Sequence, residues 1–170
     1  PPAWRNLGSI YFHMKKYDLA LENFEKCLAL DGKFALAYSN IGLVYLSRMI
    51  EENNAALAEK ALALFNKAID LAPNLAAAWS GRGSARLAVN QAGLAVGDYE
   101  RAIALDPDLM DAYINISIAL REQGRYAEAL KHLDSYKMRF YSRLPAGERA
   151  DFDRMYNEIK TLKGGRSSMS

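Results

Sequence analysis

The sequence predicts an all-α fold built as a stack of antiparallel helix pairs, and two observations carry that prediction. First, four stretches share one outline: AWRNLG at 3–8, AYSNIG at 37–42, AWSGRG at 78–83 and AYINIS at 112–117. Second, the apolar residues inside each copy recur at a spacing of three and four residues, which is typical of one face of a helix. Such periodic self-similarity indicates a repeat architecture, in which each unit buries its apolar face against its neighbours.

The period of the repeat can be measured from two landmarks. An aromatic residue opens each copy, at Trp4, Tyr38, Trp79 and Tyr113. An alanine marks the second half of each copy, at Ala20, Ala61, Ala95 and Ala129. The aromatics are spaced by 34, 41 and 34 residues and the alanines by 41, 34 and 34. The period is therefore 34, with seven extra residues between Tyr45 and Ala61, and the expected units are 1–34, 35–75, 76–109 and 110–143.

Each unit is expected to contain two helices. In the first unit, one apolar stripe runs through Trp4 and Tyr11 and a second runs through Ala20 and Phe24. Turn signals such as MKKYD at 14–18 separate the two helices, and a proline in LAPN at 71–74 and in LDPD at 105–108 ends a pair. One such hairpin cannot bury both stripes alone, so consecutive hairpins must stack.

The seven-residue insertion lies within SRMIEENNAALAEK, residues 47–60. Seven residues are close to two helical turns, and asparagine caps free backbone N–H groups at helix starts. We therefore expect Asn53-Asn54 to begin the second helix, with one extra turn on each helix, so that this hairpin projects beyond its neighbours.

The chain after the fourth unit predicts a capping helix at 145–163. Its apolar stripe contains Phe152, Met155, Tyr156, Ile159 and Leu162. A repeat stack needs an end cap with a polar outer face. The tail at 164–170 is expected to be disordered.

These residues resemble the tetratricopeptide repeat (TPR). The second copy meets the family pattern with Tyr38, Ile41, Gly42, Tyr45, Ala61, Phe65, Ala68 and Pro73. The departures are Cys27 and Gly32 in the first copy, Arg82 and Arg86 in the third, and drift in the fourth after Ala129. The resemblance covers about residues 1–141. It implies a right-handed superhelical stack, a TPR solenoid of four repeats with a C-terminal capping helix, in which 1–163 form a single domain.

Arg82 stands at a position that belongs to the core of the repeat. An unpaired charge there would be costly, and Asp98 occupies the facing helix of the same unit. We therefore expect an ion pair between Arg82 and Asp98. Binding of an anion by Arg82 and Arg86 is the alternative interpretation.

Composition narrows the classes of function. A balance of 22 basic and 20 acidic residues gives a net charge of +2, too weak for the basic stripe of a nucleic-acid-binding protein. No apolar run approaches the ~18 residues of a membrane helix, so we expect no membrane insertion. The single cysteine, Cys27, is expected to be a small buried hydrophobe.

The sequence offers little for catalysis. The two histidines, His13 and His132, lie far apart in the repeat pattern, and zinc-binding and phosphate-binding motifs are absent from the sequence. We therefore expect no enzyme activity and no cofactor. The chain begins at Pro1 without a methionine, which we interpret as a processed or excised fragment. We expect a cytoplasmic protein, and leave open a periplasmic or membrane-tethered full-length form.

The first helices of the units are expected to line a groove. At about 100° per residue, unit positions 2, 6, 9 and 13 point away from the packed stripe at positions 4, 7, 8 and 11, with positions 5 and 12 on the flanks. The candidate peptide-binding residues of this groove are Asn6, Asn40, Asn115, Arg5, Phe12, His13, Leu43, Leu46, Ser80, Ser84, Leu87, Ile114, Ile118 and Arg121.

Asparagine recurs at unit position 6, as Asn6, Asn40 and Asn115, and Gly81 interrupts the series. A primary amide carries a donor and an acceptor, so it can pair with the backbone of an extended peptide without reading its side chains. The series resembles the asparagine ladder in the TPR groove of O-linked N-acetylglucosamine transferase. The carboxylate clamp of TPR cochaperones would instead need basic residues where Ala77 and Gly81 stand, which disfavours chaperone C-terminal tails as ligands.

The leading hypothesis is a non-catalytic scaffold that binds a peptide or helical segment of a protein partner in the concave groove. One alternative is a self-assembling TPR scaffold, in which the first hairpin stacks on another copy or the long second hairpin docks into a groove. Another is the recruiting arm of a larger enzyme, such as a glycosyltransferase.

Overall fold

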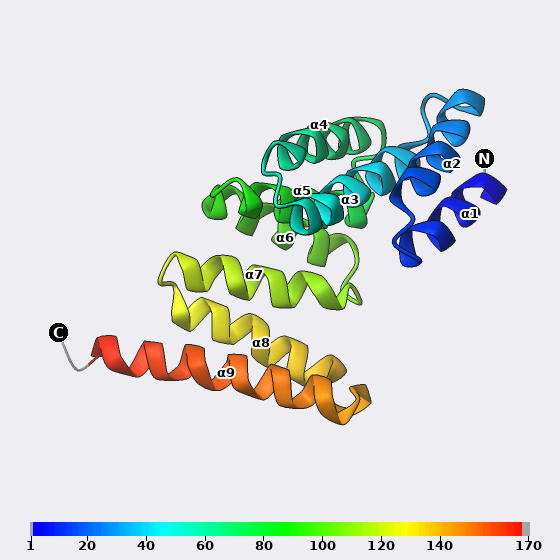
Figure 1. Ribbon diagram of the computed structural model, residues 1–170. Coiled ribbons are helices and arrows are strands. Elements are labelled where there is room, and N and C mark those ends of the chain that lie inside the picture. Colours follow the sequence, from blue (N-terminus) through cyan, green and yellow to red (C-terminus); the bar gives the residue numbers. More distant parts are fainter. Residues whose placement is uncertain (1, 168–170) are drawn as a thin grey trace.

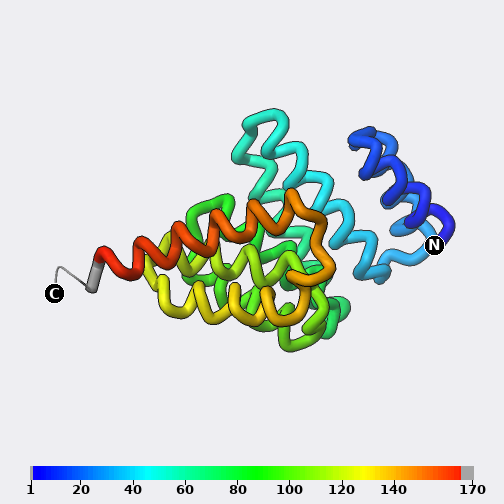
Figure 2. Tube along the Cα trace, turned by 90° about the horizontal axis from the view of Figure 1, so that it is seen from below, coloured from blue at the N-terminus to red at the C-terminus, as the bar shows by residue number. Residues whose placement is uncertain are grey.

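A computed structural model describes residues 2–167, with side chains through residue 165. The described residues form four antiparallel helix pairs and a final helix (Figure 1). The elements are α1 Pro2–His13, α2 Tyr17–Leu30, α3 Ala35–Glu52, α4 Ala56–Leu71, α5 Ala76–Ala88, α6 Ala92–Leu105, α7 Met110–Glu122, α8 Tyr126–Phe140, the 3₁₀ turn η1 Tyr141–Arg143, and α9 Ala146–Ser167. The pairs stack in chain order into a right-handed superhelix, with the two termini at opposite ends (Figure 2).

Within three of the units, a glycine of the first helix faces an aromatic ring of the second. A Cβ on Gly8 would lie 2.6 Å from Phe24 Cε1, and one on Gly42 would lie 2.9 Å from Phe65 Cζ. In the fourth unit Ser117 takes the glycine's place, and its hydroxyl lies 2.7 Å from the Tyr113 carbonyl of its own helix and 3.1 Å from the Ala129 carbonyl of α8. A small residue here therefore allows the two helices of a pair to cross closely.

The aromatic residue that opens each of the last three units is tied to the preceding turn. The Tyr38 hydroxyl donates to the Gly32 carbonyl at 3.2 Å. In the same way Trp79 Nε1 donates to the Pro73 carbonyl at 2.9 Å, and the Tyr113 hydroxyl donates to the Pro107 carbonyl at 3.1 Å. The aromatic thus positions its helix on the unit before it.

The charged residues of the third unit form the expected ion pair. Arg82 makes two hydrogen bonds to Asp98, from Nε at 3.0 Å and from one terminal nitrogen at 2.7 Å. Arg86 reaches the same carboxylate at 2.8 Å. Asp98 is only 2% exposed, so its charge is compensated inside the fold and both arginines are occupied.

The insertion lengthens the helices unequally, so the expectation of one extra turn on each helix was wrong. Helix α3 has 18 residues, against 12 or 13 in α1, α5 and α7, whereas α4 has 16 against 14 or 15 in α2, α6 and α8. Asn53 adopts a left-handed backbone (φ 49°) that ends α3, and the Asn54 side chain accepts the Ala56 N–H at 3.2 Å. Left-handed asparagine is a common helix terminator.

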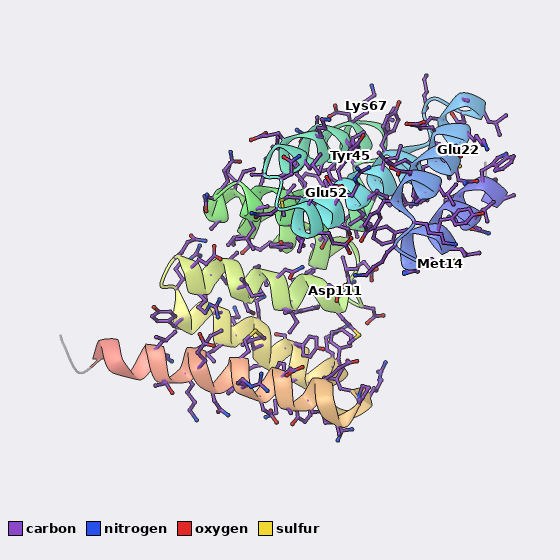
Figure 3. All side chains as sticks on the ribbon, viewed as in Figure 1. Met14, Glu22, Tyr45, Glu52, Lys67 and Asp111 are labelled. Atoms are coloured by element: carbon purple, nitrogen blue, oxygen red, sulfur yellow. The ribbon has the colours of Figure 1, made fainter. Side chains whose placement is uncertain are left out.

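The extra turn of α3 lies against the turn between α1 and α2. Glu51 Oε1 accepts from Lys15 Nζ at 2.9 Å and from the Tyr17 hydroxyl at 2.9 Å. Arg48 bridges Asp18 at 3.0 Å, close to the end of α3 where Glu52 is labelled in Figure 3. The insertion therefore links the first two units.

Helix α9 packs on α8 as the first helix of a further unit would. Phe152 and Ile159 are buried, and Phe152 stacks on Tyr136 with 5.2 Å between ring centroids. The helix passes through Gly164, where it was expected to end, so the expected disorder is wrong as far as Ser167. The rest of the expected tail, 168–170, lies outside the described residues. Each helix within 2–167 is too short or too polar to cross a membrane.

Candidate functional site

The first helices of neighbouring pairs lie next to one another along the stack. Helix α1 contacts α3, α3 contacts α5 and α5 contacts α7 across neighbouring units. The candidate residues predicted for the groove lie on these first helices.

The three asparagines of the series differ in their surroundings. Asn40 and Asn115 are half-buried, and their side-chain amides make no hydrogen bond to another residue in the described part of the chain. Asn6 is exposed, and its Oδ1 accepts from Arg5 Nε at 3.3 Å and from a terminal nitrogen at 2.8 Å. Asn6 is more exposed than Asn40 and Asn115 because, among the described residues, no unit precedes the first one and packs against it.

Asn40 lines a small pocket. It has a volume of about 150 Å³ and is lined by Ser9, Phe12, His13, Phe24, Asn40 and Leu43. The structure thus brings together four of the sequence-predicted residues, Phe12, His13, Asn40 and Leu43. Asn115 belongs to α7, at the far end of the stack, and is not part of this pocket.

The interruption of the series at Gly81 has a packing reason. The Phe65 ring from the preceding unit lies where a side chain at position 81 would begin, and a Cβ there would overlap Phe65 Cε1. Phe65 itself is fully buried and also contacts Gly42. Neither asparagine nor a basic residue fits at position 81 without displacing this ring.

Several other candidate residues already have partners. Leu46 is only 8% exposed and packs with Ala61, Phe65 and Ala85, so its assignment to the groove was wrong. The Ser84 hydroxyl lies 3.0 Å from the Tyr99 hydroxyl, and Arg121 pairs with Glu158 at 3.1 Å. Of the remaining predicted residues, Ser80, Leu87, Ile114 and Ile118 are half-buried.

Sequence reasoning missed a second pocket, where α9 meets α7 and α8. Its volume is about 260 Å³ and its lining is Ile114, Tyr136, Glu148, Asp151, Phe152 and Met155. Only Ile114 was predicted, because α9 was interpreted as a cap alone. The signal was present in the spacing, since Glu148 and Asp151 precede Phe152 and Met155 by four residues and so share their face of the helix.

Burial shifts the titration of several groups. It raises the pKa of Tyr99 to about 12, against a smaller opposing effect of the Ser84 hydrogen bond. Burial also raises the pKa of Tyr136, and the negative charges of Glu148 and Asp111 raise it further. The buried Cys27 thiol has a raised pKa from the same main cause, which makes it a poor nucleophile at neutral pH. Among the described residues, no three His, Cys, Asp or Glu side chains are grouped as metal ligands.

Comparison with protein families gives two matches. Models described as "Tetratricopeptide repeat" match residues 1–34 and 80–145. Together they cover more than half of the chain.

Known proteins and structures agree with this match. The chain is 24% identical over 178 residues to the peptidyl-prolyl cis-trans isomerase FKBP4 of Rattus norvegicus, covering 95% of this chain and 39% of that protein. It spans between 13% and 39% of the length of the curated relatives compared.

Among solved structures, a thermophilic TPR protein of Thermus thermophilus, TTC0263, has a TM-score of 0.76 at 19% identity, covering 94% of this chain and 80% of that one. The first TPR of Spaghetti (RPAP3), bound to the HSP90 peptide SRMEEVD, has a TM-score of 0.62 at 26% identity. That match covers 71% of this chain and 93% of the RPAP3 domain.

Proposed function

The chain belongs to the tetratricopeptide-repeat family, and from that premise we propose that it is a non-catalytic interaction module that holds a segment of a partner protein in the groove of its first helices. The observation that carries this proposal is the pair of half-buried, unbonded amides of Asn40 and Asn115. A buried or half-buried polar group that has no partner in the fold is suited to one on a ligand.

The chemistry of the groove favours an extended segment. Each asparagine amide can donate to a backbone carbonyl and accept from a backbone N–H, which holds a peptide without selecting its sequence. Phe12 and Leu43, in the pocket around Asn40, provide apolar surface for a side chain of the same segment. Selectivity would then come from the pockets along the groove.

The acidic peptide of the RPAP3 complex is a weaker candidate for this chain. A basic side chain at position 81 would have to displace the buried ring of Phe65. Without that residue, the clamp that receives acidic chaperone tails lacks one of its cations. We therefore propose a partner segment of a different character.

The test is a peptide array probed with the wild-type chain and with an Asn40→Ala, Asn115→Ala double variant. We expect the double variant to bind its peptides roughly tenfold more weakly or worse, since each hydrogen bond contributes on the order of 1 kcal/mol. Asn74→Ala, in the exposed loop after α4, is the matched control and should bind as wild type. Equal affinity of the double variant would refute the role of the asparagines, and an array without any bound peptide would refute the module itself.

A further inference from the structure

The pocket between α7, α8 and α9 combines an apolar interior with an acidic rim. Ile114, Phe152 and Met155 are its apolar part, and Glu148 and Asp151 stand exposed beside it on α9. The N-terminal half of α9 thus does more than close the stack, because it contributes two charged side chains to an open pocket.

A third carboxylate, Asp111, lies on α7 about one helical turn before the pocket residue Ile114. Asp111 lies in the first turn of α7, as labelled in Figure 3, and its charge acts on the Tyr136 hydroxyl together with that of Glu148. Within the described residues, neither Asp111 nor Glu148 makes an ion pair or a side-chain hydrogen bond. Asp151 has only a long, exposed contact of 3.3 Å with Arg154 on its own helix. The negative charge of this region is therefore largely uncompensated.

Tyr136 supplies an independent sign that the pocket is built for a ligand. Its side chain lines the pocket and is 6% exposed, and its hydroxyl oxygen, which remains accessible from the pocket, has no hydrogen-bond partner among the described residues. Its ring is fixed by stacking on Phe152 and by contact with Phe140 at 5.3 Å between centroids. The lone pairs of this phenol oxygen are therefore free to accept a hydrogen bond from a donor that enters the pocket.

We propose that this pocket binds an arginine side chain of the partner segment. The proposal rests on the proposed function in one respect, namely that the arginine belongs to the segment held in the groove. A guanidinium suits the site better than an ammonium because it is flat, weakly hydrated and able to lie on apolar and aromatic surface while its N–H groups reach carboxylates on both sides. Glu148 and Asp151 on α9 and Asp111 on α7 accept those hydrogen bonds, and the methylene stem covers Ile114 and Met155.

The test uses a fragment, so that it does not depend on finding the partner. N-acetyl-L-arginine amide is titrated into the whole chain and followed by ¹H–¹⁵N correlation NMR, with N-acetyl-L-citrulline amide as the uncharged analogue of the same shape. We expect arginine amide to shift the signals of residues 111–114, 136 and 148–155, citrulline amide to leave them in place, and the shifts to shrink as salt is raised.

The matched variants separate local charge from net charge. Glu148→Gln with Asp111→Asn should weaken binding roughly tenfold, since two of the three carboxylates assigned to the guanidinium are lost. Glu25→Gln with Asp70→Asn changes the net charge equally but on α2 and α4, and should bind arginine amide as wild type. The proposal is overturned if citrulline amide binds equally well, if the shifts fall elsewhere, or if both double variants behave alike. The two proposals can fail separately, because Asn40→Ala with Asn115→Ala leaves these carboxylates in place. Arginine amide can bind the pocket even if the peptide array refutes the role of the asparagines. Equally, the array can support the asparagines even if arginine amide does not bind.

Discussion

At the scale of single residues, Asp98 has the largest predicted effect on stability. It is almost fully buried and neutralises Arg82 and Arg86 together. Asp98→Ala leaves two arginines in the fold without a counter-charge, so we expect a loss of about 3–5 kcal/mol in the free energy of unfolding. Urea denaturation measures it. Asp70→Asn, at an exposed site, is the control and should stay within about 0.5 kcal/mol of wild type. An unchanged midpoint for Asp98→Ala would show that the pair does not support the fold.

The repeat made some residues predictable and others not. Arg82 and Asp98 could be paired from the sequence because their unit positions face each other within one hairpin. Leu46 was misjudged because its surroundings come from a neighbouring unit, where Ala85 of α5 covers it. The contact of Gly81 with Phe65 of α4 could not be predicted for the same reason. Helical angles within one unit contain no information on how the next unit is rotated against it.

At the scale of elements, the contacts of the α3 extension predict a local effect. Glu51 ties the second unit to Lys15 and Tyr17 of the first, and the hydrogen bond from Lys15 is the main reason that the pKa of Glu51 is lowered. Glu51→Gln should therefore speed amide hydrogen exchange in α1 and α2 at pH 7 and leave α5 to α9 unchanged, since repeat units couple only to their neighbours. Glu22→Gln, which breaks the pair with Lys26 inside α2, is the control and should have a smaller effect.

The direction of the pH dependence follows from the same contact. A carboxylate with a lowered pKa in the folded state stabilises that state above its unfolded pKa of about 4.3, and the contribution disappears as pH falls through the folded pKa. The wild type and Glu51→Gln should therefore converge in acid. A difference that grows as pH falls would contradict this assignment.

The composition of the insertion could not predict how its seven residues are divided between α3 and α4. Residues 47–60 contain good helix formers on both sides of Asn53-Asn54, so either helix could have taken the extra length. The outcome depends on Lys15, Tyr17 and Asp18, which are 30 or more residues away along the chain. Helix propensity alone does not determine where α3 ends, and contacts with residues distant in the sequence contribute to that boundary.

At the scale of the whole molecule, the two ends of the stack differ. The last pair is covered by α9, whereas within residues 2–167 no helix covers the face of α1 that corresponds to the inter-unit faces of α3, α5 and α7. The residue at unit position 10 is fully buried as Val44, Ala85 and Ala119 in the later units, but Ile10 is 54% exposed. Self-assembly, the alternative considered for this chain, would act through this open face.

The side chain at unit position 10 should contribute less to stability in the first unit than in the later units, because there it is more exposed. Val44→Ala removes buried apolar groups from the contact between α2 and α3, and we expect a loss of about 2 kcal/mol in the free energy of unfolding. Ile10→Ala removes a larger group from the same unit position, yet we expect a change within about 0.5 kcal/mol, because that side chain is already half in water. Urea denaturation of both variants at low protein concentration makes the comparison. A large loss for Ile10→Ala would mean that this face is covered in solution.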